Sequence, residues 1–398
     1  MTDIPRIISV DDHLLEPPHL FQQWLPGKYR ERGPKVVRSG IKGDFWNGMT
    51  MDSEGRPTDW WVWEDMRFPL CRNLAASGFP RDEMGMEGIT FEEMRPGCYD
   101  PKFRLQDMDL NWVDASMSFP GGFPRFCGQG FLEREDKELA LACVKAYNDF
   151  MVDEWCGDSG GRLIPLIVIP LWDPQLAADE IRRNAARGVH AVCFSELPTK
   201  LGLPSIHSGE WDPFFVACDE TRTVINMHIG SSSTTPTTSS DAPVSVNATL
   251  LFNNAMASMT DWLFSGKFQQ FPNLTLAYSE GQIGWIPYLL ERVDDVWFQH
   301  RAQGGFSGRR QELVTEPPST FFKDHIYGCF FRDRHGIRSL DQIGRENVTF
   351  ETDYPHVDSS WPDSKKVATE ILADVDDETR YKILRGNAIR MLSLDLDR

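Results

Sequence analysis

Short apolar runs recur along the whole chain, and each is too short to form a helix of ordinary length. They are rich in β-branched residues and nearly continuous in apolar character, which is typical of strands that are covered on both faces of a parallel sheet. The sequence therefore predicts eight strands, at Arg6–Val10, Val113–Phe119, Leu163–Pro170, Val189–Phe194, Thr223–Met227, Leu274–Ser279, Ile326–Phe331 and Val348–Glu351.

Helical patterns fill most of the intervals between these runs. Asp173 and Pro174 predict an N-cap followed by a proline at the first helical position, and Gly188 predicts the end of that helix. Longer amphipathic patterns cover Glu133–Trp155, Ile283–Gln299 and Asp377–Leu392. Strands that alternate with helices predict an α/β fold, a (β/α)8 TIM barrel. A doubly wound open sheet is the alternative, and it is disfavoured because no glycine-rich phosphate loop follows a predicted strand.

The segment between the first two predicted strands is long and rich in Gly, Pro, Met and Trp, and it includes Asp59–Trp63 (DWWVW). A connection of this length inside a compact domain usually carries its own structure or a function. We predict a single barrel domain over residues 1–398, with an insertion at approximately 27–105 that covers one end of the barrel as a pocket wall or subunit contact. The alternative is that its aromatic side chains only build a satellite core.

The composition and net charge of the chain limit the classes of molecule that we expect it to bind. Lys and Arg number 41 against 59 Asp and Glu, which gives the 398-residue chain a net charge of −18. We expect so acidic a surface to repel phosphate backbones and anionic lipid, which disfavours nucleic acid and membranes as partners. The N-terminal segment MTDIPRIISV lacks the pattern of a secretory signal, and the eight cysteines form no C-x-x-C pair. These features favour a cytoplasmic protein with reduced, mostly buried thiols.

Ionisable residues stand at the ends of four predicted strands: Asp11 and His13 after the first, His228 at the fifth, Glu280 at the sixth and Asp353 at the eighth. Residues two apart in an extended segment point the same way, so the first two can grip one ion together. Because all barrel strands open their carboxyl ends on one face, we expect the five side chains to converge there. Two imidazoles with carboxylates suit one divalent metal, with zinc the first expectation and manganese the second.

Each of these residues also has an ordinary structural interpretation. A D-x-H sequence after a strand is often a helix cap or a solvated turn, and a histidine at a strand end is often a hydrogen-bonded core residue. Asp353 can simply begin a turn. The joint placement of the residues at four strand ends is what favours a metal site.

Several blocks of the chain resemble the amidohydrolase-related family, the metal-dependent barrel enzymes that include aminocarboxymuconate semialdehyde decarboxylase and the resorcylate decarboxylases. The blocks are VDDHLLEPP (10–18), YDPKFRLQDMD (99–109), AYNDF (146–150), INMHIG (225–230), FPNLTLAYSEGQIGWIPYLLERVD (271–294) and NVTFETDYPHVDSSWP (347–362). The resemblance covers nearly the whole chain and implies a distorted (β/α)8 barrel that holds one catalytic divalent metal. It matches the family's metal ligands to Asp11, His13, His228 and Asp353, with Asp11-x-His13 in place of the family's H-x-H.

The chain departs from the family at the sixth strand, where the better-studied decarboxylases carry a catalytic histidine and this sequence has Glu280. A carboxylate there can ligate the metal, accept a proton from water, or orient His13 or His228. Alternatively, it caps the helix that begins near Ile283. We place His356 on the rim of the pocket, where it either handles a proton or has a structural role.

A Ser/Thr-rich tract, GSSSTTPTTSS, follows the fifth strand at 230–240. We expect it to form either a mobile lid over the mouth of the barrel or a plain polar connection.

From these residues we expect a metal-dependent amidohydrolase-type enzyme that uses a metal-activated water to hydrolyse a small, aromatic or carboxylated substrate, with Asp353, Glu280 and His356 as catalytic groups. Hydrolysis is favoured because Glu280 supplies a base, whereas the usual proton donor for decarboxylation is missing. Non-oxidative decarboxylation of an aromatic or unsaturated carboxylic acid is the alternative, and a non-catalytic barrel that binds a small molecule is the second alternative. The resemblance also implies a homodimer or larger homo-oligomer.

Overall fold

The computed structural model describes residues 4–44, 48–300 and 314–397, and the chain divides into two compact units. Unit 1 consists of Met1–Pro5, Leu171–Glu351 and Lys366–Arg398, and unit 2 consists of Arg6–Pro170 and Thr352–Lys365. Each unit contains a parallel sheet, and each is described by itself.

The parallel sheet of unit 2 has three strands. They are β1 (Ile7–Leu14), β6 (Val113–Pro120) and β7 (Leu163–Ile164), hydrogen-bonded in that order. All eight residues of β1 are buried, as its apolar pattern predicts. β7 is much shorter than the predicted run, because Pro165 and Pro170 have no N–H with which to pair with a neighbouring strand.

The parallel sheet of unit 1 has five strands. They are β8 (Ala191–Phe194), β9 (Val224–His228), β10 (Leu276–Ser279), β11 (Ile326–Phe330) and β12 (Val348–Phe350). Each pairs in parallel with its neighbour in the chain. The two sheets together contain all eight predicted strands, and in each sheet the strands follow chain order, as they do in a β/α barrel.

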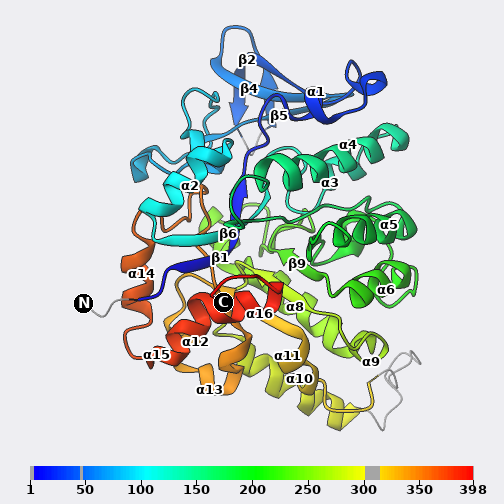
Figure 1. Ribbon diagram of the computed structural model, residues 1–398, viewed down its shortest axis with the longest axis vertical. Coiled ribbons are helices and arrows are strands. Elements are labelled where there is room, and N and C mark those ends of the chain that lie inside the picture. The colour runs from blue at the N-terminus through cyan, green and yellow to red at the C-terminus, as the bar shows by residue number, and fades with distance from the viewer. Residues whose placement is uncertain (1–3, 45–47, 301–313, 398) are drawn as a thin grey trace. The chain divides into compact units, whose positions relative to one another are not determined.

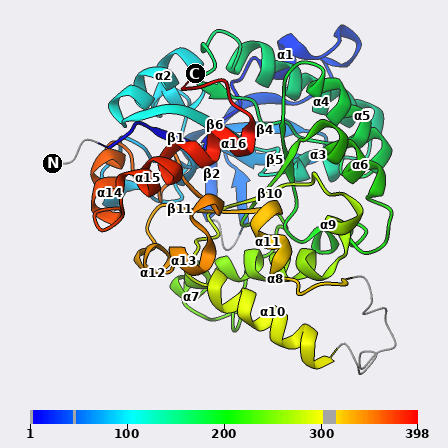
Figure 2. The same cartoon turned by 60° about the horizontal axis from the view of Figure 1, so that its bottom comes forward.

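Helices occupy most of the connections. Before residue 171 they are α1 (Leu20–Trp24), α2 (Pro101–Leu110), α3 (Gln129–Leu132) and α4 (Lys137–Phe150). After it they are α5 (Pro174–Ala185), α6 (Asp212–Thr221), α7 (Val244–Leu250), α8 (Phe252–Phe264), α9 (Lys267–Gln270), α10 (Ile286–His300), α11 (Thr320–His325), α12 (Arg334–Arg338), α13 (Leu340–Ile343), α14 (Ser364–Ile371), α15 (Asp377–Tyr381) and α16 (Asn387–Leu392). The predicted cap of α5 is confirmed, because the Asp173 carboxylate accepts hydrogen bonds from the backbone N–H groups of Gln175 and Leu176. α5 and α6 pack side by side (Figures 1 and 2).

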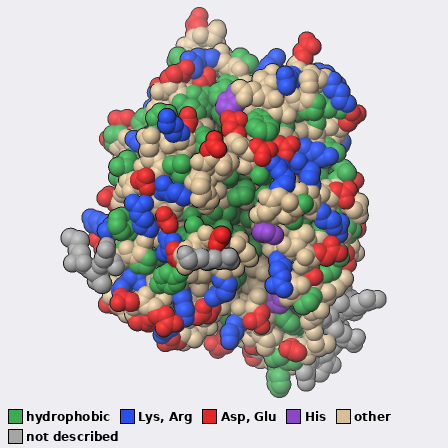
Figure 3. Space-filling view, viewed as in Figure 1, with side chains coloured by type: hydrophobic (Ala, Val, Ile, Leu, Met, Phe, Trp, Pro, Cys, Tyr) green, Lys and Arg blue, Asp and Glu red, His purple; other side chains and the backbone are tan. Residues whose placement is uncertain are grey.

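The structure shows where the cysteines and the charged side chains lie. All eight cysteines are free and buried. Within the three described ranges, no helix combines the length and apolar character that crossing a membrane requires. On the face shown in Figure 3, acidic and basic side chains are interspersed.

The long connection between β1 and β6 carries an antiparallel sheet of its own, drawn in blue in Figure 1. Its strands are β2 (Lys35–Asp44), β3 (Gly48–Met51), β4 (Arg56–Trp63) and β5 (Met66–Pro69), in the order β3-β2-β4-β5. Trp61 and Trp63 point to the same side of β4, and both contact Phe123. Their ring centroids lie 5.1 and 6.2 Å, respectively, from the ring centroid of Phe123. Phe21 and Phe131 complete this cluster, and all five rings are buried. These aromatic side chains therefore build a core inside unit 2.

Glu16 lies next to this aromatic core and is completely buried. A Cβ atom on Gly122 would lie only 2.1 Å from Glu16 Oε2, so the chain after β6 can pass this carboxyl group only as glycine. Burial raises the pKa of Glu16 to about 8, although the backbone N–H groups of Gly121 and Gly122 offset part of this effect. Near neutral pH, Glu16 is therefore largely protonated in the folded chain.

Glu16→Gln should stabilise the protein relative to wild type at pH 8 and change its stability little at pH 5. Between the usual pKa of 4.5 and the folded value of about 8, the folded state holds a proton that the unfolded state has released, so wild-type stability falls as the pH rises. The amide does not titrate, and the relative gain amounts to roughly 5 kcal/mol at most. Urea unfolding at a series of pH values measures it.

The exposed Glu31 provides the matched control, because Glu31→Gln should show no such pH-dependent difference. A stability difference between Glu16→Gln and wild type that stays constant from pH 5 to pH 8 would contradict the raised pKa.

Candidate metal centre

The carboxyl end of β1 lies beside the segment that follows β12 in the chain. The backbone N–H of Asp353 donates to the carbonyl of Asp11 (2.9 Å), and the N–H of His13 donates to the carbonyl of Tyr354 (2.6 Å). β1 continues to Leu14, four residues past its predicted end, because residues 12–14 pair with β6. Asp11 and His13 therefore lie inside the strand, with their side chains on one face, as their spacing predicts.

Unit 2 brings four of the predicted site residues together. His13 Nε2 lies 3.6 Å from Asp11 Oδ1 and 3.4 Å from Asp353 Oδ1. His356 Nδ1 lies 3.1 Å from the same Asp353 oxygen, and the two imidazole rings stack with their centroids 3.6 Å apart. All but His356 are essentially inaccessible to solvent, and the His356 side chain is 11% exposed.

The donor set of this cluster fits a divalent cation. Both oxygens of Asp353 are buried, and apart from the imidazoles of His13 and His356 beside Oδ1, neither has a hydrogen-bond donor in the part of the chain that the structure describes. Burial raises the pKa of Asp353, while the imidazole of His356 acts in the opposite direction. A cation at this position would favour the ionised carboxylate. Ligand atoms of His13, Asp353 and His356 lie within 4.8 Å of one another, which suits a first-row transition metal.

Unit 1 brings the other two predicted residues together. His228 is the last residue of β9, Glu280 directly follows β10, and His228 Nε2 lies 3.6 Å from Glu280 Oε2. The imidazole is buried, and the carboxylate is 15% exposed. The N–H groups of Ile283 and Gly284 donate to Asp333, so these hydrogen bonds give no support to the helix-cap interpretation of Glu280.

Two of the acidic residues have backbone conformations that are rare outside glycine. Asp353 has a φ of 51° and Glu280 a φ of 56°, both in the left-handed region. Such conformations cost on the order of 1 kcal/mol for a residue with a Cβ atom, and they are concentrated at functional sites. The surrounding hydrogen bonds must hold both residues in place.

Asp12 has a structural role that is not evident from the sequence. Its side chain points away from those of its neighbours Asp11 and His13 and accepts four hydrogen bonds. The donors are Ser9 Oγ (3.1 Å), Thr352 Oγ1 (2.7 Å), the backbone N–H of Tyr354 (3.0 Å) and Ser116 Oγ. Burial raises the pKa of Asp12, and Arg104 together with the donors on Ser116, Thr352 and Tyr354 offsets only part of this effect. Asp12 thus joins β1, β6 and the segment that carries Asp353.

Arg104 and Asp107 support the same segment from α2. Arg104 is buried, donates to the carbonyls of His13 and Gly97, and lies over the ring of Tyr354 at 4.4 Å. The hydroxyl of Tyr354 donates to Asp107 (2.5 Å). The block at 99–109 that resembles the family contains both residues, but its sequence does not show which groups they contact.

The insertion between β1 and β6 also contacts the segment that carries His356. The backbone N–H groups of Ala76 and Ser77 donate to the carbonyl of Pro355, and the N–H of Val357 donates to the carbonyl of Asn73. The backbone on both sides of His356 is therefore held by the insertion.

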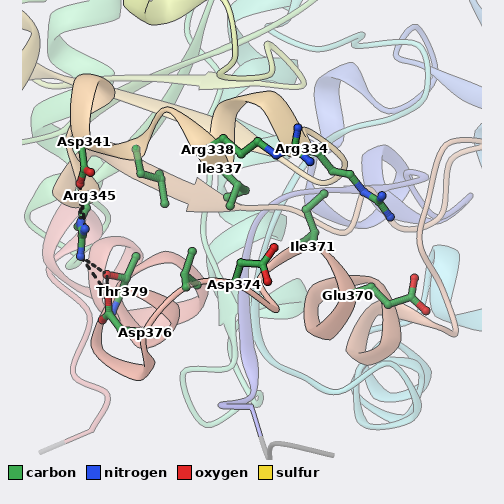
Figure 4. A pocket seen from close by; sticks show the side chains of 12 residues that line it. Arg334, Ile337, Arg338, Asp341, Arg345, Glu370, Ile371, Asp374, Asp376 and Thr379 are labelled. Carbon is green, nitrogen blue, oxygen red and sulfur yellow. Dashed lines mark hydrogen bonds and ion pairs between the residues drawn. The ribbon is translucent and has the colours of Figure 1, made fainter.

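A separate surface cavity of about 420 Å³ lies in unit 1 (Figure 4). Arg345 on its wall is committed to Asp341, Asp376 and Thr379 (2.8 to 3.0 Å). None of the residues that line it is a predicted ligand or catalytic group. The cavity is therefore not where the chemistry of the strand ends takes place.

Comparison with known proteins adds independent information. The family described as amidohydrolase matches residues 45–394. The 2-amino-3-carboxymuconate-6-semialdehyde decarboxylase of Dictyostelium discoideum is 24% identical over 336 residues, which cover 79% of this chain and 82% of the relative.

Two solved structures resemble the whole chain. An amidohydrolase from Mycobacterium avium subsp. paratuberculosis K-10 superposes with a TM-score of 0.69 at 20% identity, over 98% of this chain and 99% of its own. The 5-carboxyvanillate decarboxylase of Novosphingobium aromaticivorans DSM 12444, with bound manganese, has a TM-score of 0.66 at 16% identity, over 98% and 97% of the two chains. At these identities the likeness concerns the fold, and it implies a TIM barrel for this chain.

Asp12→Ala should destabilise the metal-free protein by about 3 kcal/mol, because it leaves one buried N–H and three hydroxyl groups without their acceptor. Ser116→Ala removes one of the same four hydrogen bonds and should cost only about 1 kcal/mol. Chemical denaturation of the two variants measures both values. Equal losses in the two variants would show that Asp12 does not hold this network together.

Proposed function

This chain belongs to the amidohydrolase family, and from that premise we propose that it is a metal-dependent, non-oxidative decarboxylase of a small aromatic or unsaturated carboxylic acid. The observation that carries the proposal is the buried cluster of Asp11, His13, Asp353 and His356. The names of the D. discoideum relative and of the N. aromaticivorans structure, both decarboxylases, support it over the hydrolysis that we expected from the sequence.

We propose that Asp11, His13, His228 and Asp353 hold the ion. The short distances from His13 to Asp11 and Asp353 support three of these assignments. The addition of His228 rests on the sequence, which predicts that all strands of a barrel open their carboxyl ends on one face. A divalent ion bound there would supply Lewis-acid chemistry to an oxygen-bearing substrate. Manganese, which the N. aromaticivorans structure contains, is tested beside the zinc that we expected.

His356 is the group that we assign to proton transfer. In decarboxylation the bond between the substrate carbon and the carboxylate breaks, its electron pair stays on that carbon, and the carbon takes up a proton as carbon dioxide leaves. Asp353 lies beside His356 Nδ1 at 3.1 Å, while Nε2 is buried and has no hydrogen-bond partner within the described chain. An imidazole held at Nδ1 by a carboxylate presents Nε2 to a reacting atom, and solvent then restores the proton. His356 is thus the proton donor in this proposal, in place of the histidine that the sequence lacks at the sixth strand.

His356→Gln should lower the rate of carbon dioxide release by about 100-fold or more, the usual contribution of general acid catalysis. Protein loaded with manganese or zinc is assayed against hydroxybenzoates and unsaturated carboxylic acids. Asp353→Asn should lower the rate similarly and should also remove the rise in Tm that the metal causes, since a ligand of the folded state stabilises it. His356→Gln should keep that rise.

His335→Gln, an exposed position on α12, is the matched control and should be fully active. Full activity of His356→Gln would exclude its role. Wild-type protein that releases no carbon dioxide from any of these acids would exclude decarboxylation of these classes, and a Tm that no metal changes would favour the non-catalytic barrel.

Hydrolysis remains the second candidate because of one observation in unit 1. Glu280 is the carboxylate at the position where the decarboxylases that the chain resembles carry a histidine, and it lies 3.6 Å from His228 Nε2. Its partial exposure gives it access to water, from which a carboxylate can accept a proton.

If the enzyme hydrolyses small esters, amides or lactones, Glu280→Gln should lower that rate by about 100-fold, because the amide cannot act as the base. Rates of ester, amide and lactone cleavage are compared for this variant, wild type and Glu291→Gln, an exposed control on α10. Absence of hydrolysis by metal-loaded wild type would reject the candidate, and an unchanged rate in Glu280→Gln would reject the role of Glu280.

A further inference from the structure

A buried carboxylate that none of the predicted roles uses lies at the carboxyl end of β8. Glu196 stands two residues past the strand and is only 2% exposed. Its Oε1 atom accepts three hydrogen bonds, from the backbone N–H of Gly230 (3.0 Å), from Ser232 Oγ (2.9 Å) and from Asn254 Nδ2 (3.0 Å). Burial raises the pKa of Glu196 to about 7, and these three donors oppose that effect. Above pH 7 the residue is therefore an ionised acceptor inside unit 1.

The first of these donors belongs to the peptide group that touches His228. The carbonyl of Ile229 and the N–H of Gly230 are the two ends of one planar peptide unit. The N–H end donates to Glu196, and the carbonyl end lies 2.6 Å from His228 Nδ1. A carbonyl oxygen only accepts hydrogen bonds, so Nδ1 carries the proton in this contact. Glu196, one peptide group and the His228 imidazole thus form a continuous chain of two hydrogen bonds.

Further contacts fix the same turn. Gly230 has a φ of 86°, which lets the chain reverse directly after β9, and the N–H of Ser231 closes the turn on the carbonyl of His228 (3.1 Å). Ser231 Oγ accepts from the N–H of Glu196 (2.9 Å), and Ser195 Oγ donates to the carbonyl of Ser231 (3.2 Å). The start of the Ser/Thr tract is therefore tied to the end of β8, which argues against a lid at this point.

We propose that Glu196 is a positioning residue that holds the 229–230 peptide, and through it keeps the proton of His228 on Nδ1 and leaves Nε2 unprotonated, the form that binds a metal ion. The role in metal binding rests on the proposed function, whereas the effect on the imidazole does not. A carboxylate that accepts from the N–H of a peptide also polarises the carbonyl at its other end, which strengthens the hydrogen bond to the imidazole. Carboxylates and carbonyls that accept from the second nitrogen of a histidine commonly set its orientation and basicity towards a metal.

A purely structural role for Glu196 makes a different prediction. Ser232 donates to the same Oε1 atom without touching the 229–230 peptide, so Ser232→Ala weakens the anchoring of the loop and leaves the chain from Glu196 to His228 intact. If Glu196 only anchors the loop, variants at the two positions affect His228 alike. If Glu196 acts through the peptide, only variants at Glu196 affect His228.

The first experiment is NMR spectroscopy of the metal-free full chain at pH 8, labelled with ¹⁵N-histidine, with the His228 signals assigned through a His228→Gln variant. Wild type and Ser232→Ala should show His228 protonated at Nδ1. Glu196→Ala should show a mixture of the two tautomers. Unchanged Nδ1 protonation in a folded Glu196→Ala protein, or equal mixtures in both variants, would overturn the inference.

The second experiment measures the affinity for Mn²⁺ by calorimetry. Glu196→Ala should weaken binding about 10- to 100-fold, the usual effect of losing such a supporting group, while Ser232→Ala should match wild type. If wild type binds no metal but Glu196→Ala changes the tautomer, the proposed function fails and the inference about His228 stands. If wild type binds Mn²⁺ and Glu196→Ala binds it equally well, the inference fails and the proposed function stands. Should Glu196→Ala not fold, Glu196→Asp decides with the same readouts, because its shorter side chain withdraws the acceptor from Gly230 while keeping the charge.

Discussion

A carboxylate that is removed from water has to be compensated by hydrogen-bond donors or by a positive charge, and this requirement organises the strand ends of both units. Asp12 and Glu196 are compensated by donors, four and three respectively. Asp11 and Asp353 instead face the imidazole of His13 at 3.6 and 3.4 Å. Neighbours in one strand thus serve different purposes, because successive side chains of a strand point to opposite faces.

Hydrogen bonds to backbone groups help to determine where the two histidines of the strands lie. The carbonyl of His13 accepts from Arg104, and its N–H donates to the carbonyl of Tyr354. His228 bonds the carbonyl of the residue that follows it. Side chains held in this way would lose little conformational entropy on binding the proposed ion, which is the physical meaning of a preorganised site. The left-handed conformations of Asp353 and Glu280 are consistent with such constraint.

The choice between hydrolysis and decarboxylation depends on where a proton donor is found. In the sequence, Glu280 replaces the histidine that the decarboxylases resembled by this chain carry after the sixth strand, and His356 is predicted only on the rim of the pocket. In the structure an imidazole comes from a different segment, since His356 stacks on His13 within unit 2. Proton transfer depends on the distance between atoms and not on the position of a residue in the chain, so a catalytic group can be supplied by another loop.

Local patterns in the sequence were sufficient to locate the parallel strands and the ionisable residues at their ends. Continuous apolar runs predicted all eight parallel strands, because burial on both faces requires such runs, and alternation along an extended chain placed Asp11 and His13 on one face. The same patterns overestimated the length of β7, because the prolines that follow it limit pairing. They also did not reveal the antiparallel sheet of the insertion, because its strands are partly exposed and mixed in composition.

The sequence by itself thus determined which segments form the parallel strands and which chemical groups stand at their ends. Only the tertiary structure decided what those groups touch: the hydrogen bond from Thr352 to Asp12 joins residues 340 positions apart, and that from Gly230 to Glu196 joins residues 34 apart. Periodicity reports the environment of a residue along its own segment, whereas the partner of a buried polar group is selected by the packing of distant segments, which no local pattern records.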